Sequence, residues 1–123
     1  MVAPAHDGVA AHVRRAAARR GRAIEVLHLP RADALPAGDR IDAAFIDGDH
    51  SYAACRRDAD AALAAGARLL ALHDIVDSDW HAASRCCVSR VWAELTAQHP
   101  QAQARMGPDW GGIGLIAVPA AEL

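Results

Sequence analysis

Apolar and polar residues follow one another in blocks that predict strands and helices in turn. Three short apolar runs have the length and the aliphatic or β-branched content of strands, at 24–29 (IEVLHL), 41–47 (IDAAFID) and 68–73 (RLLALH). Proline, glycine or aspartate follows each run, so each break falls where a strand should end. The second run is apolar at most positions, which favours a strand buried on both faces.

Three further segments have helical composition or spacing. They are 9–20, 51–65 and 86–99. Gly21 and Gly66 follow the first two as C-terminal stops, and Asp49, His50 or Ser51 could be the N-cap of the second. The third carries one apolar face, formed by Val88, Val91, Trp92 and Leu95. Residues 30–40 and the polar stretch 74–84, which contains Trp80, are predicted to be loops.

The C-terminal part predicts two more strands, at 102–106 and 115–118, joined through a glycine-rich turn at 111–114. These strands are expected to form an antiparallel edge pair. Strands that alternate with helices favour a parallel sheet with helical crossovers. We therefore expect one α/β domain over residues 1–123, with a mostly parallel sheet, a C-terminal antiparallel hairpin and helices on both faces.

Composition narrows the classes of partner and compartment. The formal net charge is −2, from 13 basic and 15 acidic residues, which gives no electrostatic basis for binding nucleic acid or an anionic membrane. The three cysteines include an adjacent pair and no Cys-x-x-Cys, so we expect neither a disulfide framework nor a structural zinc site. No signal peptide or membrane-spanning run is recognisable, and a reducing, cytoplasmic location is expected.

Chemistry-bearing side chains follow two successive strands. Asp47, Asp49 and His50 come after the second run, and His73 and Asp74 end the third. Ligands bind outside the carboxyl ends of the strands in open parallel sheets, so these residues should share one crevice. There the carboxylates could bind a hard cation such as Mg²⁺, and a histidine could act as a general base.

Each of these residues also has a plain structural interpretation. Asp49 could cap the following helix, Asp47 could hydrogen-bond its own turn, and His73 could be a satisfied strand-end histidine. The concentration of such residues at two successive strand ends favours the functional interpretation for the group as a whole.

The segment 41–77 (IDAAFIDGDHSYAACRRDADAALAAGARLLALHDIVD) resembles the fourth to fifth strands of class I S-adenosylmethionine-dependent methyltransferases. It is most similar to the group with a Phe-Ile-Asp-Gly-Asp-His-Ser-Tyr motif after one strand and His-Asp after the next. That group is similar to metal-dependent sugar and antibiotic O-methyltransferases and to cephalosporin hydroxylase-type proteins. VSRVWAELTAQHP and WGGIGLIAV resemble the next helix and the final antiparallel hairpin, so the resemblance covers 24–118.

The resemblance implies a partial Rossmann-like fold and a set of roles. Asp47 and Asp74 match metal-ligand positions, and His73 stands where some relatives have a further acidic ligand. His50 matches the proposed base that takes a proton from the substrate hydroxyl. The implied activity is O-methylation of a small hydroxylated molecule, with S-adenosylmethionine and Mg²⁺ as cofactors.

The sequence departs from this family on the cofactor side. No glycine-rich turn after a first strand and no ribose-binding carboxylate is recognisable, and Gly111, Gly112 and Gly114 precede a strand instead of opening a helix. The chain could be a fragment, a degenerate relative, or a part completed by a partner. The alternative function is a non-catalytic α/β binding module. A metallophosphoesterase or an all-helical His-Asp phosphohydrolase fits the residue spacing less well.

The missing strands also predict how the sheet is completed. The run at 24–29 would lose its family neighbours, and the run at 41–47 would expose an apolar edge. We expect the two runs to pair directly. We also expect two chains to associate across the same side, giving a homo-oligomer.

Overall fold

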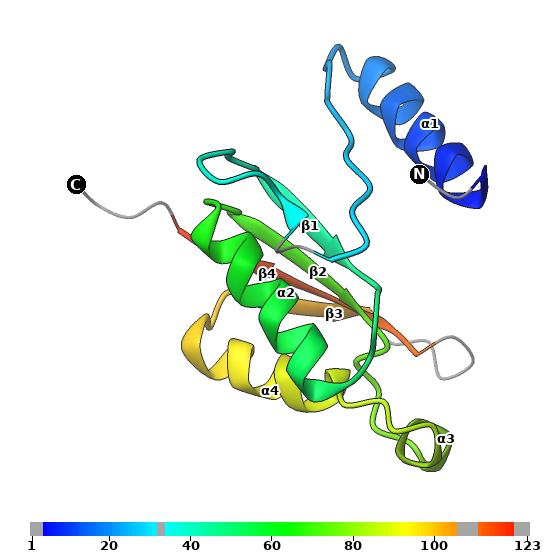
Figure 1. Ribbon diagram of the computed structural model, residues 1–123, viewed down its shortest axis with the longest axis vertical. Helices are drawn as coiled ribbons and strands as arrows, with labels where there is room; N and C mark the ends of the chain where they lie inside the picture. The colour runs from blue at the N-terminus through cyan, green and yellow to red at the C-terminus, as the bar shows by residue number, and fades with distance from the viewer. Residues whose placement is uncertain (1–3, 32–33, 106–110, 120–123) are drawn as a thin grey trace. The chain divides into compact units, whose positions relative to one another are not determined.

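The computed structural model describes residues 4–31, 34–105 and 111–119. Its elements are α1 (Pro4–Ala18), β1 (Ala43–Ile46), α2 (Tyr52–Ala64), β2 (Leu69–His73), α3 (Asp79–Ala83), α4 (Val88–Gln98), β3 (Ala102–Arg105) and β4 (Ile113–Ala117). They divide into two compact units, Met1–Pro30 and Arg31–Leu123 (Figure 1). None of the described helices has the length and apolarity needed to cross a bilayer.

The Met1–Pro30 unit contains α1 and the segment after it. Gly21, at φ +69°, turns the chain at the end of the helix as predicted. The prediction of a strand at 24–29 is wrong, because that segment has no regular secondary structure. Ile24 and Leu27 are 43% and 53% exposed, and none of the described strands pairs with this segment to stabilise an extended strand.

The Arg31–Leu123 unit is built on a four-stranded sheet in the order β1-β2-β4-β3. β1 and β2 are parallel, whereas β4 runs antiparallel to both β2 and β3. The α/β class and the antiparallel C-terminal pair are confirmed. The prediction of a mostly parallel sheet is wrong, because β4 turns back and inserts beside β2, which makes two of the three pairings antiparallel. Met106, at the end of the predicted 102–106 strand, lies outside the described residues.

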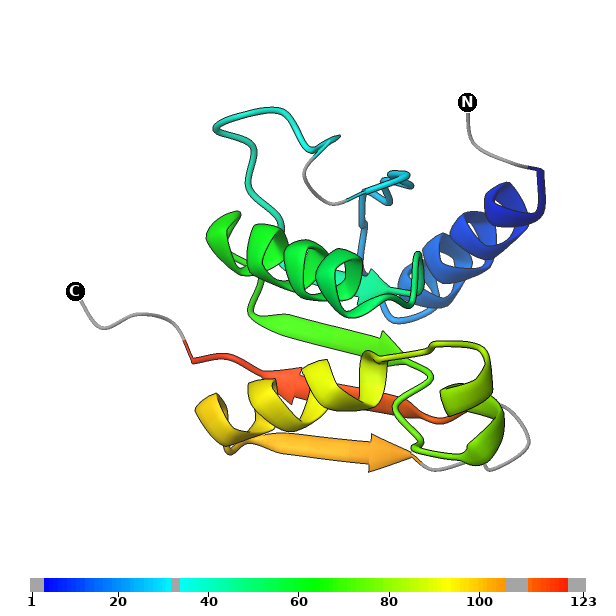
Figure 2. The same cartoon turned by 60° about the horizontal axis from the view of Figure 1, so that its bottom comes forward.

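The helices α2 and α4 contact each other and pack over one face of this sheet, α2 against β1 and α4 against β2 and β4 (Figure 2). The core lies between these layers and includes Leu70, Leu72, Val91, Leu95 and Ile116, which are all fully buried. We expected helices on both faces of the sheet. Within this unit, α2 and α4 both cover the same face.

The ends of α2 match the residues that predicted them. The Ser51 hydroxyl accepts a hydrogen bond from Ala54 N–H at 3.3 Å, as an N-cap does. Gly66, at φ +96°, follows the helix, where its N–H donates to Leu63 O at 3.0 Å. The prediction that 74–84 is a loop is wrong at Asp79–Ala83, which form the short helix α3. The Ser78 hydroxyl caps this helix.

β1 is an edge strand, and among the described residues β2 is the strand it pairs with. The prediction that the 24–29 segment pairs with the 41–47 strand is therefore wrong. Side chains alternate across a strand, so Phe45 and Leu69 lie on the face opposite α2 and α4, where they are 58% and 42% exposed. An edge strand and an exposed apolar face are compatible with association of two chains, which stays a prediction.

Candidate metal centre

The carboxyl ends of β1 and β2 bring the sequence-predicted side chains together. Asp47 follows β1, His73 ends β2, and Asp74 comes next, while His50 precedes α2. One potential ligand atom from each of these four residues lies within 4.8 Å of the other three. The prediction of one shared cluster at adjacent parallel strand ends is confirmed, and we call this cluster the quartet.

The contacts in the quartet join each histidine to both carboxylates. His73 Nδ1 lies 3.0 Å from Asp47 Oδ1 and 3.3 Å from Asp74 Oδ2. His50 Nε2 lies 3.3 Å from Asp47 Oδ1, and its Nδ1 lies 3.2 Å from Asp74 Oδ2. The side chains of the quartet range from 11% exposed at Asp74 to 44% at Asp47, so the cluster is open to solvent on one side.

These separations fit a divalent ion. With bonds of roughly 2.1 Å, neighbouring ligand atoms are about 3.0 Å apart in octahedral and about 3.4 Å apart in tetrahedral coordination. His73 Nδ1 and its two carboxylate neighbours already have this spacing. Imidazole nitrogen beside carboxylate suits first-row transition ions, whereas Mg²⁺ favours an all-oxygen shell. The donor set therefore fits Mn²⁺ or Zn²⁺ better than the expected Mg²⁺.

The backbone at Asp74 is held by the glycine turn before β4. Asp74 has φ +63°, an uncommon conformation for a residue with a side chain. Its N–H donates to Gly112 O at 3.0 Å, and Val76 N–H donates to Gly111 O at 3.0 Å. Gly111 has φ +79°, and a Cβ there would collide with the Asp74 carboxylate. The turn thus lets the backbone approach closely enough to fix that carboxylate.

A backbone hydrogen bond positions His50. Its carbonyl accepts a hydrogen bond from Cys87 N–H at 2.8 Å, which joins the quartet to the start of α4. Asp49, the other acidic residue of the motif, does not belong to the quartet. Its Oδ1 accepts from Ser51 N–H at 2.8 Å, and this hydrogen bond lowers the pKa of Asp49. Asp49 therefore has a structural role in the turn before α2, and the cap considered for it from the sequence is formed by Ser51 instead.

The tyrosine of the motif connects two helices. Tyr52 donates its hydroxyl to Glu94 Oε2 at 2.8 Å, and the Arg90 guanidinium lies 4.1 Å from the centre of its ring. The hydrogen bond to Glu94 raises the pKa of Tyr52. Tyr52 thus joins α2 to α4 and is not a member of the quartet.

Sequence reasoning missed a second group beside the quartet. Asp74, His81 and Cys86 each offer a ligand atom, and these atoms lie within 4.8 Å of one another. His81 Nε2 lies 3.3 Å from Asp74 Oδ1, and its Nδ1 lies 2.6 Å from the Ser78 hydroxyl. The capping signal Ser78-x-x-His81 was present in the sequence, but the turn that brings His81 back to Asp74 depends on tertiary structure.

Neither the buried Cys55 nor the half-buried Cys86 is an activated nucleophile. Burial raises the pKa of the Cys55 thiol to about 12, and it also raises the pKa of Cys86. Reactive cysteines need a lowered thiol pKa, so the geometry favours no covalent role for either side chain.

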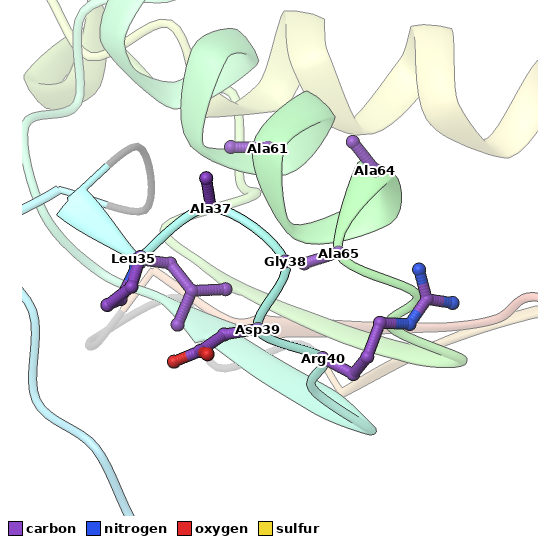
Figure 3. A pocket seen from close by; sticks show the side chains of 9 residues that line it. Leu35, Ala37, Gly38, Asp39, Arg40, Ala61, Ala64 and Ala65 are labelled. Atoms are coloured by element: carbon purple, nitrogen blue, oxygen red, sulfur yellow. The ribbon is translucent and has the colours of Figure 1, made fainter.

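Two hollows lie at the other end of the sheet from the quartet. One, of about 360 Å³, lies between the loop at Ala37–Arg40 and the end of α2 at Ala61 and Ala65 (Figure 3). The other, of about 480 Å³, is lined by residues at the start of β1 and β2 and the end of β4. Neither brings titratable groups together as the quartet does, so we place the candidate site at the quartet.

The glycines before β4 do not form the cofactor loop of the family that the sequence resembles. That loop opens a helix, whereas Gly111 packs against Asp74, Gly112 O accepts the hydrogen bond from Asp74 N–H, and a Cβ on Gly114 would collide with the Trp92 ring. These glycines therefore serve close packing around β4 and not a cofactor loop.

The resemblance to methyltransferases thus rests on the motif residues and on the strand ends that carry them. The quartet is a structural finding, and its use in methyl transfer stays a prediction. Comparison of the chain with protein-family models, with curated proteins and with solved structures finds no match, so the functional assignment rests on the geometry of the quartet.

Proposed function

We propose that this chain binds a divalent transition-metal ion at the quartet and serves as the acceptor side of an S-adenosylmethionine-dependent O-methyltransferase. The observation that carries the proposal is the convergence of two carboxylates and two histidines from two adjacent strand ends. The order β1-β2-β4-β3, in which the C-terminal strand β4 is antiparallel to its neighbours, supports the proposal, because the resembled methyltransferase fold also ends in an antiparallel hairpin.

Within the proposal, three residues bind the ion and one handles the proton. Asp47, His73 and Asp74 are the ligands, since one atom of His73 lies at coordination spacing from both carboxylates. A divalent ion held there would lower the pKa of an approaching hydroxyl group. His50, in contact with both carboxylates, would take the hydroxyl proton as general base.

Because Gly111 and Gly114 pack against side chains, they cannot form a cradle for the methyl donor, and the proposal covers the acceptor side alone. A small hydroxylated molecule is the proposed acceptor, because the quartet is open to solvent on one side. The second candidate function, a metal-binding module without methyl transfer, is favoured by the packing of Gly111 and Gly114 against side chains, which leaves them unable to form a cofactor loop. Micromolar binding of S-adenosylmethionine in calorimetry would rule out the second candidate, whereas weak binding is compatible with both.

The metal site itself is tested by titrating the full chain with Mn²⁺, Zn²⁺ and Mg²⁺ in separate calorimetric experiments. We expect tighter binding of the transition ions than of Mg²⁺. The His73→Ala variant should lose at least about tenfold in affinity, the low end of what even outer partners of a metal contribute.

Asp49→Asn is the matched control, because Asp49 lies in the same motif but outside the quartet. It should bind metal as the wild-type chain does. The proposal is wrong if the wild-type chain binds no ion, or if His73→Ala binds as tightly as Asp49→Asn.

A further inference from the structure

Asp74 presents its two carboxylate oxygens to different groups. Oδ2 lies 3.2 Å from His50 and 3.3 Å from His73, in the quartet. Oδ1 lies 3.3 Å from His81 Nε2, on the side of α3. A carboxylate used in this way has the arrangement of a bridging ligand between two cations.

The histidine on the α3 side is buried and makes several contacts. His81 is 5% exposed, its Nδ1 lies 2.6 Å from the Ser78 hydroxyl, and its ring packs edge-on against Trp80 at 5.0 Å. Cys86 N–H donates to His81 O at 2.8 Å, which places the cysteine beside the histidine. Figure 2 shows α3 at the carboxyl end of β2, where Asp74 follows the strand.

The contact to Ser78 matches the outer partner of a metal-bound histidine. Such a histidine usually donates its second ring N–H to a nearby oxygen, which leaves the other nitrogen for the ion. If His81 Nδ1–H donates to the Ser78 oxygen, the Nε2 lone pair faces Asp74 Oδ1 at 3.3 Å. Two buried lone-pair atoms at that distance need a proton or a cation between them.

We propose that Asp74 Oδ1, His81 Nε2 and Cys86 Sγ form a second metal subsite for a thiophilic divalent ion such as Zn²⁺, with Asp74 bridging it to the quartet. Oxygen, nitrogen and sulfur donors together suit Zn²⁺, and three protein ligands leave one position open to solvent or substrate. On binding, the Cys86 thiol releases its proton to solvent and coordinates as thiolate. This subsite goes beyond the proposed function, which uses only the quartet.

Cobalt(II) is the probe, added to the full chain under reducing conditions. Thiolate coordination gives a near-ultraviolet sulfur-to-cobalt charge-transfer absorption, which an outer hydrogen-bonding role of Cys86 would not produce. We expect this absorption in the wild-type chain and two bound ions per chain. Cys86→Ser and His81→Gln should lose the absorption and bind one ion.

Cys87→Ser is the matched control, because the neighbouring Cys87 thiol donates a hydrogen bond to Arg85 O and lies outside the group. It should keep both the absorption and the second ion, and this comparison decides the question even if His81→Gln does not fold. The proposal is overturned if wild type shows no charge-transfer absorption, or if Cys86→Ser keeps it.

His73→Ala separates this subsite from the quartet, because His73 is absent from the second group. We expect that variant to lose one ion and keep the charge-transfer absorption. If the proposed function is wrong, His73→Ala and the wild-type chain will bind the same number of ions. If the second subsite is wrong, the wild-type chain will show no charge-transfer absorption.

Discussion

Asp74 determines how the strand ends become a site. Its positive φ turns the chain out of β2, and its two oxygens reach His73 on one side and His81 on the other. This conformation is maintained by the hydrogen bond from Asp74 N–H to Gly112 O and by close packing against Gly111. The geometry of the proposed metal site therefore depends on two glycines that carry no functional group.

Gly111→Ala should reduce metal affinity and stability together. The added Cβ would collide with the Asp74 carboxylate, and alanine is also strained at φ +79°. We expect a loss of about 1–3 kcal/mol of stability, the usual cost of such backbone strain, measured by urea denaturation. Gly38→Ala is the control, because Gly38 has φ +88° but open space around its Cβ. Metal affinity that fell equally in both variants would contradict this account.

His50→Ala distinguishes a base from a ligand. His50 contacts both carboxylates through different ring nitrogens, so it does not present one atom to both as His73 does. We expect His50→Ala to bind Mn²⁺ nearly as tightly as wild type, as measured by calorimetry. A loss as large as that of His73→Ala would make His50 a fourth ligand.

At the scale of the elements, helical spacing located α4 correctly, whereas strand composition located the four strands of the sheet and failed at 24–29. The apolar positions Val88, Val91 and Leu95 are buried in α4 as their spacing predicts. The segment 24–29 has equally apolar residues but forms no strand, because a strand is stable only beside a partner.

A pair of leucine substitutions tests this difference. Leu95→Ala removes a side chain that is 0% exposed and should cost about 2–5 kcal/mol of unfolding free energy. Leu27→Ala removes one that is 53% exposed in the 24–29 segment and should cost less than about 0.5 kcal/mol. Chemical denaturation of the two variants measures both values. A cost at Leu27 close to that at Leu95 would restore 24–29 as a core element.

At the scale of the whole molecule, β1 is an edge strand of the described sheet, and apolar side chains are exposed on the face opposite α2 and α4. Phe45 lies on β1 and Leu69 on β2, both largely exposed opposite the helices. Edge strands with exposed apolar residues favour pairing with another chain.

We expect the chain to self-associate through β1. Phe45→Asp should shift sedimentation toward the monomer, because a carboxylate on this face opposes burial. Trp80→Asp is the control, since Trp80 is 68% exposed but lies on α3. A wild-type chain that sediments as a monomer at all concentrations tested would contradict the prediction.

We expect no micromolar binding of S-adenosylmethionine by the 123-residue chain. The glycines that could have formed a cofactor loop pack against Asp74 and Trp92 instead. Calorimetry should therefore show binding weaker than about −8 kcal/mol, the free energy of micromolar affinity. Tighter binding would mean that the described residues contain a cofactor site of another kind.

By itself, the sequence determined the elements whose signals are local. Gly66 ends α2 as predicted, and the N-cap is Ser51, one of the three candidates, because caps depend on a few neighbouring residues. The strand breaks near Asp47 and His73 lie where polar residues meet apolar runs. The meeting of the quartet followed from a general rule, that parallel neighbouring strands end at the same edge of a sheet.

Only the tertiary structure decided the features that depend on distant partners. Three features are of this kind: the insertion of β4 beside β2, the absence of a strand at 24–29, and the contact of His81 and Cys86 with Asp74. Each depends on residues that a local sequence pattern does not relate to one another. Strand pairing and side-chain coordination are long-range interactions. Their free energy depends on which surfaces the folded chain brings together, and a periodic pattern carries no information about that choice.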